Sequence, residues 1–151
     1  MVDMLSMYEG GIKIRRGKRT DFPALMALLA TESSGEASKG QIRHWRRLAS
    51  DPGLDFYVAE QRETIQGMVL VCYIRDLRCP GWQAILDIVV PASVEYGIAQ
   101  ALLAFAKARA RKRGCQRLLV CEIERQGNSR NVSLGPAGFR PIGEVLSCEV
   151  A

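Results

Sequence analysis

The spacing of hydrophobic positions along the chain predicts a succession of short strands and helices. Alternating or β-rich segments predict strands over residues 12–16, 54–60, 65–75, 82–90, 118–123 and 144–150. Apolar stripes at helical spacing predict helices over residues 20–29, 41–49 and 95–113, and the polar segment 127–134 is typical of a short helix or turn. Strand–helix–strand over residues 84–123 needs a crossover and parallel pairing, whereas the hairpins are antiparallel. This order predicts an α/β domain with a mixed sheet.

Capping and turn residues mark the ends of these elements. Thr20 is a candidate N-cap for the first helix, and Gly114 follows the longest helix at a position that suits a C-cap. Gly10 and Gly11 end a first segment that has no clear periodicity. We therefore expect residues 1–11 to form a loose N-terminal arm and residues 12–151 to form a single domain.

Composition narrows the class of protein. The chain has 151 residues, of which 48% are hydrophobic and 25% charged, and these proportions exclude a disordered chain. The longest apolar run, residues 68–74, is far shorter than the roughly 20 residues that a membrane span requires. The first residues lack the pattern of a secretion signal, so a cytoplasmic protein without a membrane partner is expected. The five cysteines show no C-x-x-C spacing and the only histidine is His44, so no metal site is expected.

Basic residues exceed acidic residues by 21 to 16 and are unevenly distributed. No acidic residue occurs between Tyr96 and Cys121, and six cations fall in that window. Such a cluster either attracts an anion, such as nucleic acid, an acidic protein or a phosphorylated cofactor, or complements the dipole at the end of a helix. No aromatic residues interleave with it as single-strand binding would require, so nucleic acid is not the expected partner.

The turn between the strand ending at Val90 and the helix beginning near Glu95 is a candidate phosphate site. The first N–H groups of a helix have no partner within the helix and attract phosphate oxygens. Gly97 and Ala99 are small enough to allow a pyrophosphate close to the backbone. A glycine near the start of a helix is common, however, so this spacing alone is a weak signal.

Several motifs together resemble the GNAT acetyltransferase superfamily. Pro91 lies six residues before Gly97-Ile98-Ala99, and the leucine pair Leu102-Leu103 follows, as in the acetyl-CoA motif of that family. Further matches are the hairpin segments 56–60 and 65–67, Asn128, Leu134 and Gly138-Phe139. These matches occur in the family's order and extend over about residues 12–150.

The resemblance implies an acyl-CoA N-acyltransferase-like fold, whose mostly antiparallel sheet has one parallel pair of strands that splay apart. It also implies acetyl-CoA as cosubstrate and direct transfer of an acetyl group to an amine, carried by a small molecule or a protein. The pantetheine arm would lie beside Ile88, Val89 and Val90. The pyrophosphate would be held by the N–H groups of Glu95, Tyr96, Gly97, Ile98 and Ala99, with Asn128 on the other side. The oligomeric state stays open, with a homodimer as one option.

The sequence also departs from the family pattern. Val94 stands where the motif has Arg or Gln, and Glu95 where it has Gly. The tyrosine that protonates the leaving thiolate in this family would fall at Leu134 or Gly135, neither of which donates a proton. A weakened or inactive relative that acts as an acyl-CoA-binding or regulatory module is therefore the alternative function.

Asp87 is the candidate general base, because a carboxylate in an otherwise apolar strand is expected to have a raised pKa. Pairing with a neighbouring basic residue is the alternative role for Asp87. Weaker candidates for base or acid are Glu122, Glu124, Tyr57, Tyr73, Cys121 and His44. The expected acceptor region is basic and favours an anionic or carboxylated acceptor; its arginines are Arg43, Arg46, Arg47, Arg75 and Arg78.

Overall fold

The computed structural model of the protein describes residues 7–9, 11–29, 38–91, 96–120, 134–135 and 137–150. Its strands are β1 (Met7–Glu9), β2 (Ile12–Arg16), β3 (Leu54–Gln61), β4 (Thr64–Arg75), β5 (Trp82–Val89) and β6 (Cys115–Val120). Its helices are a 3₁₀ turn η1 (Arg19–Asp21), α1 (Phe22–Leu29), α2 (Lys39–Ser50) and α3 (Tyr96–Lys112).

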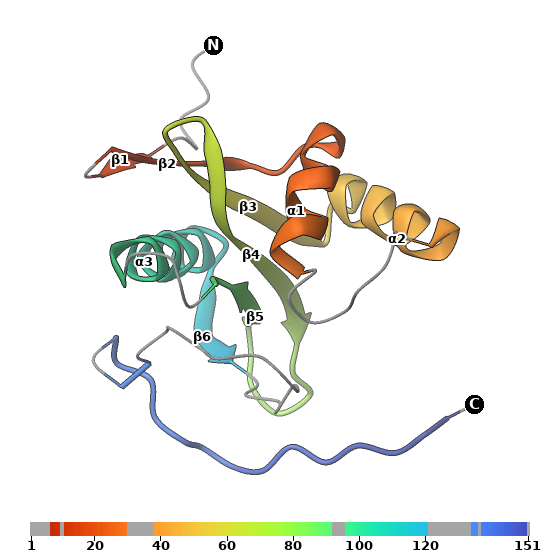
Figure 1. Ribbon diagram of the computed structural model, residues 1–151. Coiled ribbons are helices and arrows are strands. Elements are labelled where there is room, and N and C mark those ends of the chain that lie inside the picture. The colour runs from red at the N-terminus through yellow and green to blue at the C-terminus, as the bar shows by residue number, and fades with distance from the viewer. Residues whose placement is uncertain are drawn as a thin grey trace.

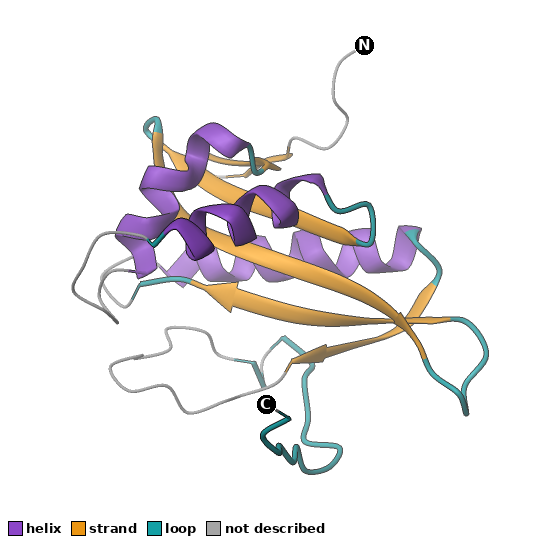
Figure 2. Cartoon of the chain, turned by 90° about the vertical axis from the view of Figure 1, so that its right-hand side faces the viewer, coloured by secondary structure: helices purple, strands orange, loops and turns teal. Residues whose placement is uncertain are grey.

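The six described strands form one sheet in the order β1-β2-β3-β4-β5-β6. Neighbouring strands are antiparallel except β5 and β6, which run parallel because α3 carries the chain across the sheet between them. α3 covers one face of the sheet, and α1 and α2 cover the other (Figure 1). In Figure 2, α1 and α2 lie in front of the sheet and α3 lies behind it. The predicted mixed, mostly antiparallel α/β fold is confirmed.

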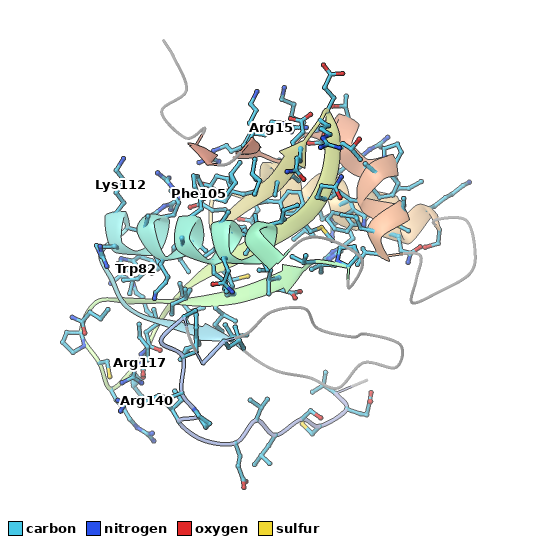
Figure 3. The ribbon with its side chains drawn as sticks, turned by 60° about the vertical axis from the view of Figure 1, so that its left-hand side comes forward. Arg15, Trp82, Phe105, Lys112, Arg117 and Arg140 are labelled. Atoms are coloured by element: carbon cyan, nitrogen blue, oxygen red, sulfur yellow. The ribbon has the colours of Figure 1, made fainter. Side chains whose placement is uncertain are left out.

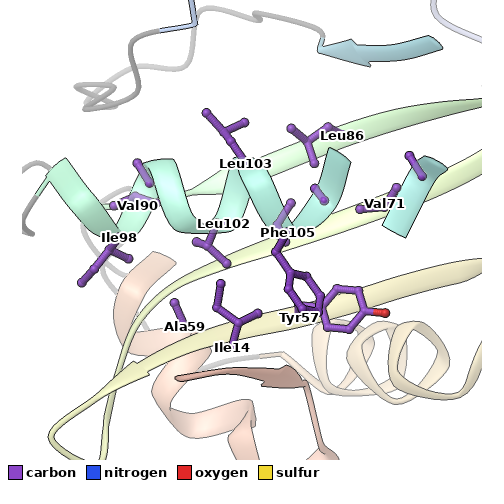
Figure 4. Packing of buried hydrophobic residues seen from close by; sticks show 14 of the residues in the cluster. Ile14, Tyr57, Ala59, Val71, Leu86, Val90, Ile98, Leu102, Leu103 and Phe105 are labelled. Carbon is purple, nitrogen blue, oxygen red and sulfur yellow. The ribbon is translucent and has the colours of Figure 1, made fainter. Parts of the chain in front are cut away.

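The larger core lies between the sheet and α3. Leu102 is fully buried there, and the rings of Tyr57 and Phe105 meet edge to face with their centroids 4.7 Å apart (Figure 4). Alternation along β3 explains this placement, since Tyr57 faces α3 while Phe56 faces α1 and α2. Helix α3 ends as predicted, because Gly114 has φ +77° at the C-terminal turn.

A smaller core lies under α1 and α2. Its buried members are Leu25, Phe56, Val58 and Met68. Trp45 of α2 packs on this group with its ring centroid 5.8 Å from that of Phe56. No residue of α2 is fully buried, so this helix rests on the sheet mainly through Trp45 and its neighbours.

The boundaries differ from the sequence-based predictions in three places. Residues 7–9 of the expected loose arm form β1, which pairs with β2. The first helical turn begins after Lys18 and not after Thr20, and Asp21 accepts a 2.7 Å hydrogen bond from the Lys18 N–H. The final strand predicted over residues 144–150 is wrong. Those residues are exposed and contain no helix or strand, because no neighbouring strand covers their apolar side chains in the part of the chain that the structure describes.

Candidate functional site

β5 extends beyond its last described pair with β6. Their last register pair is Leu86 with Val120, yet β5 continues to Val89. β4 still pairs with this extension, for Ile88 lies opposite Val69 and Val89 opposite Met68. The edge of residues 87–89 that faces away from β4 is therefore unpaired among the described residues. An extended ligand with amide groups can pair with such an edge.

The helix that follows β5 in the chain is α3. α3 starts at Tyr96, so the N–H groups of residues 96–99 have no acceptor within the helix. Ile98 and Ala99 turn their side chains into the core, whereas Gly97 is exposed and a Cβ placed on it would meet nothing within 4 Å. These donors and the open space at Gly97 fit a pyrophosphate group. Glu95 and Asn128 lie outside the described residues, as does the side chain of Tyr96.

The end of β5 is packed from both faces of the sheet. Ile88 contacts the core on the α3 side, Val89 contacts the core on the α1 side, and Val90 is buried. A Cβ on Gly67 of β4 would lie 3.1 Å from the side chains of both Val90 and Leu102. The sequence analysis did not single out Gly67, although a glycine within a strand signals such a close approach.

Asp87 lies on the sheet face that α1 and α2 cover, one residue beyond the last β5–β6 pair. Asp87 is exposed, although its neighbours along β5, Leu86 and Ile88, are apolar. Its strand neighbours are Leu70, directly opposite, and the half-buried Cys72. Burial and the negative charge of Asp87 raise the pKa of the Cys72 thiol, so this cysteine is held as the neutral thiol.

The weaker candidates fall elsewhere. Tyr57 is part of the core against α3, and burial with the nearby Asp55 charge raises its pKa. His44 is exposed on α2. Leu134 packs against the α3 core and Gly135 is exposed, so neither expected position of the family's acid carries a proton donor. The remaining candidates lie outside the described residues: Cys121, Glu122 and Glu124.

The basic end of α3 lies away from the candidate phosphate site. Gly97 and Arg113 are separated by about 24 Å along the helix axis, and Figure 3 shows Lys112 at the end of α3 opposite its start. Two of the cations there are used internally: Arg113 donates to Asp55 at 3.1 Å, and Arg109 lies 3.9 Å from the same carboxylate. Lys107 donates to the Ala137 carbonyl at 2.8 Å. Three of the six cations in this cluster therefore have partners within the fold.

Asp55 is the buried charge that the sequence analysis missed. Its side chain is 0% exposed and also accepts hydrogen bonds from Arg16 at 3.4 Å and from the Tyr73 hydroxyl at 2.6 Å. Burial, followed by donation to Asp55, raises the pKa of Tyr73, which therefore acts as a fixed donor. An aspartate inside the apolar run 54–59 was the available signal, but its cationic partners are distant in sequence.

The arginines expected around an acceptor occupy two separate parts of the fold. Arg43, Arg46 and Arg47 are on α2, whereas Arg75 ends β4 and its guanidinium stacks on the Trp82 ring at 4.2 Å. Within the described ranges, no group of three or more His, Cys, Asp or Glu residues is arranged to hold a metal ion. No helix of those ranges is long and apolar enough to cross a membrane.

Proteins of known family and known structure resemble this chain. A family model described as the acetyltransferase (GNAT) family matches residues 22–135. A transcriptional regulator from Bacillus halodurans C-125 is 22% identical to the chain, with a TM-score of 0.78 over 92% of this chain and 99% of that one. Glucosamine-6-phosphate N-acetyltransferase from Arabidopsis thaliana is 17% identical, with a TM-score of 0.72 over 91% of this chain and 97% of that one. A predicted acetyltransferase with acetyl-CoA from Clostridium acetobutylicum is 16% identical, with a TM-score of 0.67 over 91% of this chain and 96% of that one. Curated proteins gave no match.

Proposed function

Because the chain belongs to the GNAT acetyltransferase family, we propose that it transfers an acetyl group from acetyl-CoA directly to an amine. The observation that carries this proposal is the position of the end of β5, which has no partner on that side among the described residues, before the start of α3. The pantetheine amides would pair with the edge formed by residues 87–89, and Ile88, Val89 and Val90 would line the arm. The N–H groups of residues 96–99, with that of Glu95, would hold the pyrophosphate, and Asn128 would contact the opposite side of the cosubstrate.

Asp87 is the proposed general base. Acetyl-CoA supplies the acetyl group as a thioester, and the acceptor must reach it as a neutral amine. Asp87 lies one residue beyond the last described β5–β6 pair and is exposed. Its carboxylate takes the proton of the acceptor ammonium, directly or through one water. The amine can then form the new C–N bond as the C–S bond breaks.

Two variants test the two halves of the proposal. Asp87→Asn is expected to lower turnover by about 100-fold or more with unchanged CoA affinity, measured by thiol release and by calorimetry. Gly97→Ala is expected to weaken CoA binding without loss of folding stability, because the added methyl enters open space that the phosphate would use. Glu63→Gln, at the exposed β3–β4 turn, serves as control. Full turnover in Asp87→Asn would remove Asp87 as the base, and full CoA affinity in Gly97→Ala would move the phosphate site elsewhere.

A weakened or regulatory acyl-CoA-binding protein is the second candidate function. Leu134 and Gly135 favour it, because neither supplies a proton for the leaving thiolate. Tight CoA binding without thiol release across a broad panel of amines would establish this second function. Thiol release with any amine of the panel would establish the transferase.

The setting of the proposed reaction follows from charge and composition. We place the protein in the cytoplasm, acting on a small-molecule or protein amine, without a nucleic-acid or membrane partner; a homodimer is one possible assembly. Cell fractionation tests the location, and salt-sensitive retention on DNA would contradict the absence of a nucleic-acid partner. Light scattering after gel filtration measures the oligomeric state.

A further inference from the structure

A groove of about 480 Å³ lies between α1, α2 and β3, on the sheet face that α3 does not cover. This volume is within the range of small-molecule sites. The groove lies over β3, two strands from β5, and is lined by none of the residues assigned to acetyl-CoA above. It therefore needs an explanation of its own.

The walls of the groove are apolar and largely aromatic. Phe22 of α1, Trp45 of α2 and Phe56 of β3 line it, and the Phe22 and Trp45 ring centroids are 6.2 Å apart. Ile42, one turn before Trp45, completes the α2 side. Phe22, Ile42 and Trp45 are only half-buried, so each presents apolar surface to a ligand. A hydrocarbon or ring of a small molecule gains free energy by covering that surface.

The rim of the groove is cationic. Arg19 and Arg46 line it and are exposed, and a second hollow of about 310 Å³ beside it adds Arg43. Among the described residues, no carboxylate forms an ion pair with these three arginines. Asp21 lies in the chain between Thr20 and Phe22, which line the groove. Its carboxylate instead accepts hydrogen bonds of 2.8 Å from both terminal nitrogens of Arg15. Unlike Arg109 and Arg113, these exposed guanidinium groups have no carboxylate partner among the described residues and are available to an anion.

We propose that this groove binds a small amphipathic anion, whose apolar part lies against Trp45 and Phe56 and whose carboxylate meets Arg46. A guanidinium recognises a carboxylate through paired N–H donors, which explains arginine at this rim. Arg43 and Arg46 are among the arginines expected around the amine acceptor, but the groove that they border lies over β3, two strands from β5. Binding here therefore requires neither acetyl-CoA nor Asp87.

The chain provides its own reporter for a test. It has two tryptophans, and Trp82→Phe leaves Trp45, in the wall of the groove, as the sole tryptophan, whose emission is excited selectively over that of the tyrosines. Octanoate and 1-octanol share a chain length and differ in charge. In Trp82→Phe we expect both to change Trp45 fluorescence, with octanoate binding at least about tenfold more tightly. Raising the salt concentration should weaken octanoate binding and leave octanol binding unchanged.

A second substitution on α2 identifies the charge involved. Adding Arg46→Gln should reduce the preference for octanoate to about threefold or less, whereas Arg47→Gln on the same helix should leave it intact. Arg47 lines neither hollow, so it controls for the general charge of α2. Equal affinity for octanoate and octanol, or an equal loss in the two arginine variants, would overturn the proposal. Neither result depends on acetyl transfer, so the fluorescence titrations test this site separately from the proposed catalytic function.

Discussion

On the face covered by α3, the sheet and helix bury 16 apolar residues in one cluster, whereas the described part of the face under α1 and α2 buries four. On the α3 face, Arg109 and Arg113 form ion pairs with the buried Asp55. On the α1–α2 face, Arg19 and Arg46 stand unpaired in the described structure beside a groove. Similar basic residues thus have a structural role on one face and remain accessible on the other.

The difference follows from where the carboxylates lie. Asp55 is the one fully buried carboxylate of the described residues, and it concentrates Arg16, Arg109 and Arg113 around itself. α2 contains no acidic residue, so its cations have no such centre within their own helix. A surplus of positive charge in the sequence therefore does not indicate an anion-binding site until the partners of each cation are known.

Removing the carboxylate of Asp55 should produce the largest effect. Asp55→Asn leaves three arginines around a neutral amide, and breaking a buried ion pair from one side costs about 3–5 kcal/mol. Urea unfolding monitored by circular dichroism measures this loss. The exposed Glu63→Gln should change the free energy of unfolding by less than about 0.5 kcal/mol. Equal stability of these two variants would contradict a structural role for Asp55.

Matched leucine truncations compare the two cores directly. Leu102 of α3 and Leu25 of α1 are 0% and 2% exposed, respectively. Leu102→Ala should cost about 3–5 kcal/mol and Leu25→Ala about 2–3 kcal/mol, because Leu25 already borders the groove and its site can collapse or fill with water. Urea unfolding measures both losses. A larger loss of unfolding free energy for Leu25→Ala than for Leu102→Ala would reverse the ranking of the two cores.

The sequence predicts the elements whose stability is local or periodic. α3 is recognisable from its apolar stripe and Gly114, and the β3–β4 hairpin from two β-rich segments on either side of the polar turn 61–64. β1 is only three residues long and depends on pairing with β2, which no local pattern reveals. The strand predicted over 144–150 shows the converse, because alternation alone does not specify a partner.

The candidate site was predictable only in outline. The family motif identified the turn between β5 and α3, and the structure places the end of β5 beside the start of that helix. Asp87 is exposed in the folded sheet, and the buried Asp55 is paired with arginines 39 and 58 residues away. Such long-range relations are properties of the folded chain.

The ion pair between Arg15 and Asp21 predicts that the free energy of unfolding depends on pH. Burial alone would raise the pKa of Asp21, but the hydrogen bonds from Arg15 and the Lys18 N–H hold it below its usual value. The folded state therefore binds this proton less readily than the unfolded state, in which the pKa is about 3.9. The stabilisation is present above about pH 5 and is lost as the pH falls through the folded pKa.

Asp21→Asn should accordingly cost about 1.5–3 kcal/mol at pH 7, and the gap to the unsubstituted protein should narrow below pH 4. Urea unfolding at pH 7, 5 and 3 measures the gap. Arg15→Gln should lose a similar amount, and the double variant should show strong non-additivity. A gap that widens in acid would mean that the pKa of Asp21 is raised by burial and not lowered by Arg15.

The smallest expected effect concerns how α2 is held on its face. Ser38 accepts a 3.1 Å hydrogen bond from the Gln41 N–H, and the Gln41 side chain accepts a 2.9 Å bond from the Ser38 N–H. Ser38→Ala should cost about 1 kcal/mol, and because α2 has no fully buried residue the loss should appear as local opening. Hydrogen exchange should accelerate in α2 and not in α3, with Ser50→Ala at the other end of α2 as control. Uniform acceleration across both helices would mean that the two faces unfold as one unit.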